Sequence, residues 1–427
     1  MPFGLPGDLC SLTATQTVRL VQDGELRTEA LVDAVLERVE AREPELRALA
    51  YFDPDHARRL AASCRAGPLR GVPLGAKDVL DTADMPAEYG SPICRGWRPR
   101  ADAAAVAWAR AAGAWCYCKT VTTEFATRRP GPTINPHAPG RTPGGSSSGS
   151  AAGVADFFFP FAYGSQTAGS VIRPAAFCGV VGYKPTFGLI SRAGMKLMSD
   201  SLDTIGVIAR SVADCALLAG AVSGRDLGDP DSAPGRAPRV GICRSPVWEL
   251  AAPETHGLLP RVATALGRAG AAVIERELPA DFAGLIEAHP IIMNAESARA
   301  LGWELAHARD RISDVLLERL EFGLSQGSAA LAAAYAVFDR TQAAFPMAME
   351  GLDVLVTPSA PGEAPEGIGW TGDPAFNSIW TSLHVPCVTV PAGVGPNGLP
   401  LGIQIVGQRG EDREVLAWAQ WVAAAVG

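Results

Sequence analysis

Residues 142–153 read TPGGSSSGSAAG, and the interpretation of this small polar run decides both the fold class and the function of the chain. Runs of Gly and Ser often form flexible linkers, but this one is short and apolar segments flank it. It lacks the GxxxxGK string of a phosphate-binding loop. It fits the GxSxG pattern of a nucleophile elbow around Ser147, yet an elbow requires a strand directly before it. The preceding NPHAPGRTP is rich in Pro and Gly and is typical of a loop.

The segments on either side of this run predict an α/β fold. From Gly67 onward, short apolar runs punctuated by Gly and Pro alternate with helix-like segments, as expected for strands that alternate with helices. Residues 281–350 are mainly helical, and the chain then returns to strands. We therefore expect one large α/β domain at residues 66–427, with a helical segment at residues 1–65 packed on its core. Residues 230–350 form a more variable, mainly helical section that we expect to line part of a substrate pocket.

The composition excludes several classes of function. The chain has 427 residues, 48% of them hydrophobic, and a net charge of −8, which disfavours nucleic acid or an anionic membrane as a partner. No stretch reaches the roughly 18 unbroken apolar residues of a membrane helix, and the N-terminus MPFGLPGDLCSL lacks the pattern of a signal peptide. The nine cysteines are scattered, which indicates reduced thiols and a cytoplasmic protein. They do not cluster with histidines at ligand spacing, so we expect no metal site.

A second serine follows the small polar run, in FFFPFAYGSQTAGSVIRPAAFCG at residues 157–179. An apolar run ends at Tyr163, small residues make a turn, and Ser170 stands at the start of a predicted helix. The backbone N–H groups at such a turn can face a developing negative oxygen, so Ser170 is well placed to act as a nucleophile. A serine nucleophile also needs a base to accept its proton.

Two residues are candidates for that base. His137 lies close to the small polar run, but an isolated His in a Pro-rich loop is usually structural or exposed. Lys77 follows a short apolar run in GVPLGAKDVL, and burial there would lower its pKa enough to leave it neutral near pH 7. Asp78 is equally suited to form an ion pair with Lys77, so the residues alone leave the base open. All four lysines of the chain fall between residues 77 and 196, in the same region as the two serines.

Four segments together resemble the amidase signature family in their order and spacing. They are GVPLGAKDVLDTADMPAEYGSP (71–92), GRTPGGSSSGSAAGVA (140–155), GSQTAGSVIRPAAFCGVVGYKPTFGLISRAG (164–194) and SLDTIGVIARSVADCALL (201–218). A weaker match continues into WTSLHVPCVTVPAG and LGIQIVGQ near the C-terminus. The resemblance implies a single large α/β domain in which helices cover both faces of a mixed central β-sheet. It also implies a protein that needs no cofactor, and a homodimer, since many members of the family are homodimers.

The resemblance further implies a Ser-Ser-Lys triad. Lys77 matches the general base, Ser146 the bridging serine whose preceding peptide bond is cis, and Ser170 the nucleophile. The oxyanion donors of the family are backbone N–H groups, which here belong to Thr167, Ala168, Gly169 and Ser170. The residues that we expect to bind the substrate are Arg173, Gly145, Trp380 and His384. Arg173 matches an arginine that binds a substrate carboxylate in malonamidase-like members and is mainly structural in others.

Two positions depart from the family pattern, and three functions remain to be distinguished. Ala168 replaces a glycine, which is tolerated if its φ is negative, and Gln166 replaces a common Asp that would alter the support of the loop. The resemblance predicts an amidase that hydrolyses the C–N bond of a small-molecule amide through an acyl-enzyme. The first alternative is the glutaminase subunit of a tRNA-dependent amidotransferase, against which the change at Ala168 argues. The second is a non-catalytic amidase-like binding protein that keeps the Ser/Gly loop as an anion nest.

Overall fold

The short apolar runs form one mixed sheet. In the computed structural model, which describes residues 8–232 and 234–427, eleven strands pair in the order β1-β3-β2-β4-β6-β5-β10-β11-β9-β7-β8. The first seven residues, which hold part of the predicted N-terminal helical segment and of the stretch without a signal-peptide pattern, lie outside the described residues. The strands are β1 (Leu49–Phe52), β2 (Pro73–Lys77), β3 (Trp115–Thr120), β4 (Phe161–Gln166), β5 (Val181–Lys184), β6 (Thr204–Ala209), β7 (Arg239–Ile242), β8 (Ala272–Glu275), β9 (Val354–Pro358), β10 (Cys387–Val394) and β11 (Pro400–Val406).

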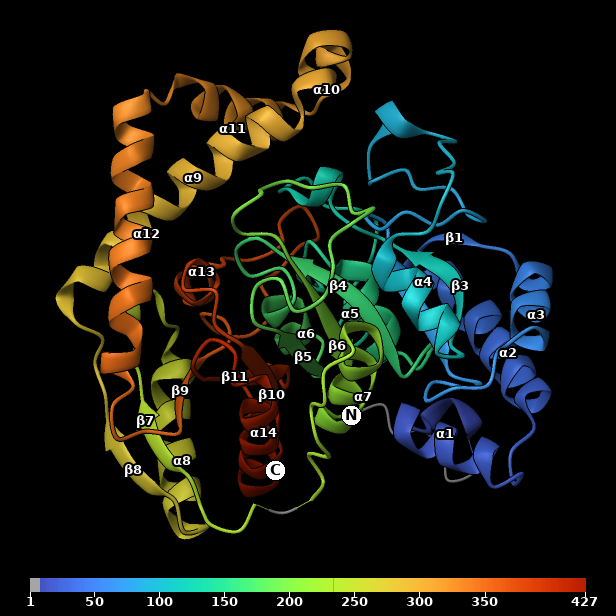
Figure 1. The fold of residues 1–427 in the computed structure, drawn as a ribbon, viewed down its shortest axis with the longest axis horizontal. Helices are drawn as coiled ribbons and strands as arrows, with labels where there is room; N and C mark the ends of the chain where they lie inside the picture. Colours follow the sequence, from blue (N-terminus) through green and yellow to red (C-terminus); the bar gives the residue numbers. More distant parts are fainter. Residues whose placement is uncertain (1–7, 233) are drawn as a thin grey trace.

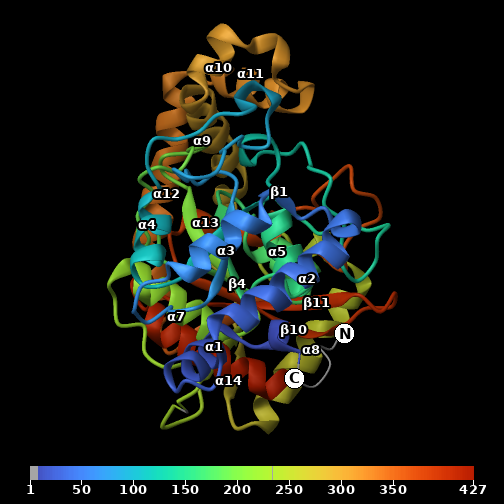
Figure 2. The same ribbon diagram turned by 90° about the vertical axis from the view of Figure 1, so that its right-hand side faces the viewer.

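Helices cover both faces of this sheet, which confirms the predicted fold class. They are α1 (Ala14–Gln22), α2 (Thr28–Leu46), α3 (Pro54–Ala62), α4 (Ala104–Ala111), α5 (Ser148–Ala155), α6 (Ile172–Phe177), α7 (Val212–Ser223), α8 (Pro253–Arg268), α9 (Gly284–Ala300), α10 (Gly302–His307), α11 (Asp314–Ser325), α12 (Ser328–Ala348), α13 (Ala375–Ser382) and α14 (Asp412–Val426). One face packs on α4, α7, α8 and α14, and the other on α2, α3, α5 and α6, with α9, α12 and α13 beside them. Figure 2 looks onto the N-terminal helices α1, α2 and α3.

The N-terminal segment is not wholly helical, contrary to the prediction for residues 1–65. Residues 49–52 form β1, the edge strand of the sheet, which pairs antiparallel with β3. The sequence LAYF is only four residues long, and its strand conformation depends on a partner that lies far away in the chain, so local periodicity does not reveal it. Because β1 extends the central sheet, this segment is part of the same domain.

Three parallel strands position the two serine segments and the lysine. β2 pairs in parallel with both β3 and β4, so their carboxyl ends meet at one edge of the sheet. Lys77 is the last residue of β2, and Gln166 is the last residue of β4. The small polar run leads into α5, whose Gly149 allows a close approach: a Cβ there would lie 2.1 Å from the Ala48 carbonyl oxygen.

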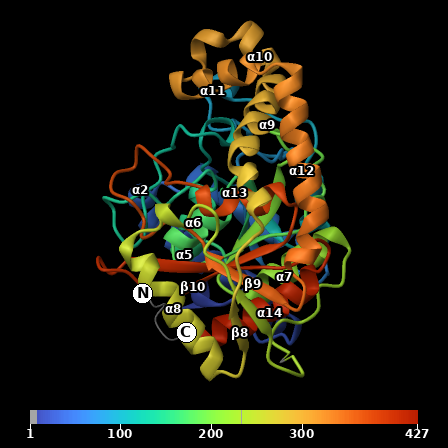
Figure 3. The same cartoon turned by 90° about the vertical axis from the view of Figure 1, so that its left-hand side faces the viewer.

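Helices α9 to α12 form a separate layer at one end of the molecule. Figure 1 shows them in orange beyond the sheet, and Figure 3 shows α9 and α12 lying side by side. α11 also packs on α9, and α9 packs on α13. The layer confirms the mainly helical character predicted for residues 281–350. In the described part of the chain, no helix combines the length and apolar character needed to cross a bilayer.

Candidate active site

Lys77 is fully buried, and no carboxylate of the described residues is bound to it. Its Nζ lies 2.7 Å from Ser146 Oγ, 2.8 Å from Ser165 Oγ and 3.2 Å from the Ser165 carbonyl oxygen. Burial lowers the pKa of Lys77 to about 7; the negative charge of Asp203 opposes this shift, and the positive charge of Arg173 adds to it. An amine in this environment is largely neutral at slightly alkaline pH, as a proton acceptor must be.

Asp78, the other partner considered for Lys77, binds a different lysine. Its Oδ1 accepts a hydrogen bond from Lys119 Nζ at 2.8 Å, and both side chains are buried. The ion-pair interpretation of Lys77 and Asp78 is therefore wrong. Because neighbouring residues of an extended chain point to opposite faces, Lys77 and Asp78 turn toward different parts of the molecule.

The small polar run is buried and held against the second serine segment. The peptide bond between Gly145 and Ser146 is cis, and Ser146 is 2% exposed. The backbone N–H of Ser147 donates to the Ser170 carbonyl oxygen at 3.4 Å, so the two serine-bearing loops are in contact. No strand directly precedes Ser147, which rules out the elbow interpretation. His137, the other candidate base, shares a hydrogen bond of 2.9 Å between its Nε2 and the Cys178 carbonyl oxygen and has a structural role.

The turn between β4 and α6 presents backbone N–H groups without partners. Among the described residues, no hydrogen bond leaves the N–H groups of residues 167–170, whereas those of Val171 and Ile172 both bind Gln166 Oε1. Gln166 thus supports the turn in place of the usual Asp. Ala168 does not have a positive φ, so the turn tolerates alanine in place of glycine at this position. Such an array of free N–H groups can stabilise a negative oxygen.

Ser170 opens onto a cavity of about 300 Å³. The cavity lies between the β4–α6 turn, helices α9 and α11, and residues 371–378 at the start of α13. Thr167 and Ala168 also line it. Ser170 is 9% exposed, so its hydroxyl is reachable from the cavity while Lys77 and Ser146 lie deeper.

Arg173 lines the same cavity and is only partly hydrogen bonded. Its Nε donates to the Thr371 carbonyl oxygen at 2.8 Å and one terminal nitrogen donates to the Gly145 carbonyl oxygen at 2.7 Å. The other terminal nitrogen, Nη1, is buried without a partner among the described residues. Burial lowers the pKa of Arg173 to about 10. A Cβ on Gly169 would meet this Nη1 at 2.9 Å and Asn377 Oδ1 at 2.3 Å, so glycine is required where the turn meets the arginine.

Trp380 and His384, two predicted substrate contacts, do not line this cavity. Trp380 is fully buried in the core, where its ring packs against Phe345 with a centroid distance of 6.2 Å. His384 stacks on Phe187 at 4.1 Å and binds the Ser201 carbonyl oxygen at 2.7 Å. The prediction was wrong for both, because the spacing of aromatic residues does not distinguish a side chain packed in the core from one that lines a pocket. Gly145 contributes its carbonyl oxygen to Arg173 and is not part of the lining.

Several residues at the site were not predicted from the sequence. Ser165 binds Lys77 through two atoms, and Asp203 accepts from Thr167 Oγ1 at 2.5 Å beneath the turn. The sequence could have indicated both residues, since Ser165 and Asp203 lie in segments that resemble the amidase signature family. Three others line the cavity from segments without any motif, namely Arg128, His289 and Arg319. His289 Nε2 lies 2.9 Å from the Thr167 carbonyl oxygen, and burial lowers its pKa to about 4, so its ring is neutral and Nε2 donates.

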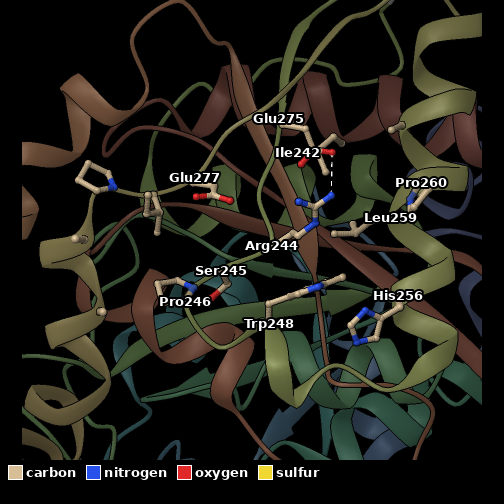
Figure 4. Close-up of a pocket in the computed structure, with 15 residues that line it drawn as sticks. Ile242, Arg244, Ser245, Pro246, Trp248, His256, Leu259, Pro260, Glu275 and Glu277 are labelled. Carbon is tan, nitrogen blue, oxygen red and sulfur yellow. Dashed lines mark hydrogen bonds and ion pairs between the residues drawn. The ribbon is translucent and has the colours of Figure 1, made fainter.

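A larger cavity, of about 700 Å³, lies elsewhere and has a different character. Figure 4 shows it at the carboxyl ends of β7 and β8, where Arg244 reaches Glu275 at 3.2 Å beside Trp248. The His256 ring lies edge-on to Trp248 with its centroid 4.6 Å away. Among the residues that line this cavity, Arg244 is paired with Glu275, and no lysine is present. The smaller cavity at Ser170 is therefore the candidate active site.

Comparison with known proteins places this geometry in context. The family model described as Amidase matches residues 30–416. A glutamyl-tRNA(Gln) amidotransferase subunit from Salinispora arenicola is 32% identical, with 98% of each chain covered. The solved structure of 6-aminohexanoate cyclic dimer hydrolase is 29% identical, covers 98% of this chain and 97% of its own, and superposes with a TM-score of 0.89. That of peptide amidase from Stenotrophomonas maltophilia is 30% identical, covers 97% and 96%, and has a TM-score of 0.80.

Proposed function

The chain belongs to the amidase family, and this membership indicates a hydrolase that acts on amide C–N bonds. We propose that it cleaves a small-molecule amide through Ser170, Ser146 and Lys77. The observation that carries the proposal is the fully buried lysine amine 2.7 Å from the Ser146 hydroxyl, in contact with no carboxylate. A charged lysine in that position would be left without a counter-ion, whereas a neutral one can accept a proton.

The hydrogen bonds of Lys77 suit proton transfer from Ser146. A neutral amine has two hydrogens and one lone pair. Ser165 offers two acceptors, its Oγ at 2.8 Å and its carbonyl oxygen at 3.2 Å. When both hydrogens are donated to Ser165, the lone pair faces Ser146 Oγ and the Ser146 hydroxyl donates to it. Ser165 is thereby a positioning residue for the base.

The reaction proceeds through two half-reactions. Ser170 Oγ attacks the amide carbon while its proton passes to Ser146 Oγ and the Ser146 proton passes to Lys77 Nζ. The carbonyl oxygen becomes negative and is bound by the free N–H groups of residues 167–170. Lys77 then returns a proton through Ser146 to the leaving nitrogen, the C–N bond breaks, and an acyl ester remains on Ser170. Water repeats the sequence, releases the carboxylic acid and restores the serine.

Arg173 is the proposed substrate contact nearest to the reacting atoms. Its unpaired Nη1 is adjacent to Gly169 in the turn, and its other nitrogens are fixed by Gly145 and Thr371. A buried guanidinium with one donor free gains a strong hydrogen bond when an oxygen of the substrate reaches it. We propose that Arg173 orients the substrate in this way.

The second candidate function is the glutaminase subunit of a tRNA-dependent amidotransferase. The observation in its favour is the 32% identity to the glutamyl-tRNA(Gln) amidotransferase relative. Release of ammonia from glutamine by the isolated chain, or only with added partner subunits, would support it. Hydrolysis of other small amides without glutaminase activity would favour the amidase instead.

A fluorophosphonate probe tests the proposed nucleophile, because it labels activated serines. We expect labelling of the native chain, loss of labelling and of amide hydrolysis in Ser170→Ala, and retention of both in Ser378→Ala. Ser378 is a matched control because it lines the same cavity, but among the described residues its hydroxyl binds only the Ala375 carbonyl oxygen, at 3.4 Å. A native chain that is neither labelled nor active on a panel of amides would contradict the proposal and support the binding-protein alternative.

The homodimer stays a prediction, which analytical ultracentrifugation would test.

A further inference from the structure

The cavity at Ser170 carries an excess of positive charge. Three arginines line it, Arg128, Arg173 and Arg319, against a single carboxylate, Asp373. The neutral His289 adds no charge at pH 7. The whole chain, by contrast, has a net charge of −8. A cationic lining inside an acidic protein therefore needs a local explanation.

Arg128 and Arg319 line the same cavity, and Arg128 is exposed. Among the described residues, neither forms a salt bridge or a side-chain hydrogen bond, although Arg319 is half-buried. Burial and the positive charge of Arg128 lower the pKa of Arg319 to about 10, while the negative charge of Glu318 opposes this shift. Burial also lowers the pKa of Arg173; the negative charge of Asp373 opposes that shift and the positive charge of Arg128 adds to it. Arg128 thus lies close enough to both other arginines to repel them.

The fold holds this repulsive pair in place from both sides. Arg128 follows η3 (Glu124–Ala126), where Phe125 and Ala126 have positive φ values of 44° and 58°, which non-glycine residues rarely adopt. The Glu124 carboxylate, 1% exposed, accepts a hydrogen bond from Ser313, the residue directly before α11. Glu124 thereby links the loop of Arg128 to the helix of Arg319. Phe125 packs in the same apolar cluster as the inner face of α11.

From this arrangement we propose that Arg128 and Arg319 form an anion-binding subsite that takes a carboxylate of the substrate at a distance from the amide being cleaved. Two guanidinium groups can each present paired N–H donors to a carboxylate. An anion between them would also offset their mutual repulsion, a gain that a neutral ligand does not provide. The inference rests on the proposed function and narrows its substrate to carboxylated amides.

Two substrate classes share this chemistry, and rates distinguish them. One is the monoamide of a dicarboxylic acid, with the carboxylate on the acyl side. The other is an N-acyl amino acid, with the carboxylate on the leaving amine. We would measure kcat/KM for glutaric acid monoamide against pentanamide, and for N-butanoylglycine against N-methylbutanamide. We expect at least one carboxylated member to be preferred by about tenfold or more.

Variants of Arg128 and Arg319 test whether these arginines cause the preference for carboxylated amides. Arg319→Gln and Arg128→Gln should each lower the carboxylated-to-neutral ratio of kcat/KM by about tenfold, mainly through KM, and Arg319→Lys should lower it less. Arg244→Gln is the matched control, since it removes an arginine from the other cavity and should leave the ratio unchanged. An unchanged ratio in both subsite variants, with pentanamide still hydrolysed, would overturn the subsite and leave the proposed function standing.

A binding measurement covers the case in which an arginine variant folds poorly or no substrate turns over. Calorimetry of glutaric acid monoamide with the Ser170→Ala chain should detect binding that weakens about tenfold when Arg319→Gln is added, with melting temperatures measured in parallel. Binding lost with Arg319 in a chain that hydrolyses no amide would sink the proposed function alone. Binding that does not depend on Arg128 or Arg319 would sink the subsite.

Discussion

The two walls of the cavity at Ser170 are built in different ways. One wall is the turn after β4, which carries Ser170, and behind it lie Lys77 at the end of β2 and Ser165 on β4. The other comes from α9, α11 and the loop before Arg128, and its arginines bind nothing within the described residues. The side chains behind the first wall bind one another, whereas the arginines of the second form no salt bridge within the described residues. If the proposed function holds, the difference assigns the reaction to residues of the sheet and the selection of the substrate to the helices.

The largest test of this comparison replaces the lysine of the first wall. Lys77→Met should lower kcat by about a thousandfold or more, because the proton acceptor is lost. Lys184→Met is the control: Lys184 is equally buried, but it binds backbone carbonyl oxygens of Pro185 and Val385, so its loss should lower the melting temperature and spare kcat. Steady-state kinetics and calorimetry separate the two results. Near-native turnover in Lys77→Met would remove lysine from the mechanism.

The pH dependence of the native chain provides the next test. Because burial lowers the pKa of Lys77 to about 7, kcat/KM should level off above pH 7 and fall about tenfold for each pH unit below it. The same group affects stability: the unfolded chain holds this proton up to about pH 10.5, so stability gained from Lys77 should rise between pH 7 and 10.5. Denaturant titrations of native and Lys77→Met chains across this range should show the slope only in the former. A rate profile that is flat down to pH 5 would contradict a lysine base.

A smaller effect is expected where the two walls meet, at Gly169. Gly169→Ala places a Cβ 2.3 Å from Asn377 Oδ1 and 2.9 Å from Arg173 Nη1, so the turn must shift away from both. Displaced N–H donors bind the oxyanion less well, and we expect kcat to fall by about ten- to a hundredfold. Gly140→Ala, whose Cβ would meet no atom within 4 Å, is the control. Equal rates for the two variants would show that the turn does not bind the reacting oxygen.

The smallest effect concerns a residue that the sequence misassigned. Trp380→Phe should leave KM for any hydrolysed amide within about twofold, because Trp380 packs in the core and its Nε1 has no hydrogen-bond partner among the described residues. The smaller ring leaves a cavity that should cost about 1–2 kcal/mol of stability. Denaturant unfolding and steady-state kinetics measure both. A large rise in KM without loss of stability would return Trp380 to the substrate pocket.

The first wall could be predicted from the sequence, and the second could not. Lys77, Ser146 and Ser170 each lie in a long local pattern of small residues at a strand end or a turn, and such patterns are visible in the residues themselves. Arg128 and Arg319 are separated by 191 positions (319 minus 128) and come together only because α11 packs beside the loop of Arg128. Nothing in the helical periodicity of α11 distinguishes Arg319 from an arginine on a solvated face.

Each prediction of the fold depended on whether the local sequence carries a periodic signal. Helices and buried strands with their own periodicity were found, including the long helical section at residues 281–350. The strand β1 was missed because four residues between two helices carry no periodic signal, and it exists through pairing with β3. Trp380 was misplaced because burial in a core and lining of a pocket require the same aromatic residue. In each case the deciding contact lies outside the local segment.

The place of Lys77 at the end of β2 has one more consequence. β2 is hydrogen bonded on both sides, to β3 and β4, and each of its five residues is buried. Separating these central strands costs nearly as much as unfolding the whole domain. The strand that holds the Lys77 amine should thus stay closed while surface loops move, and backbone deuterium uptake at β2 should be among the slowest in the protein.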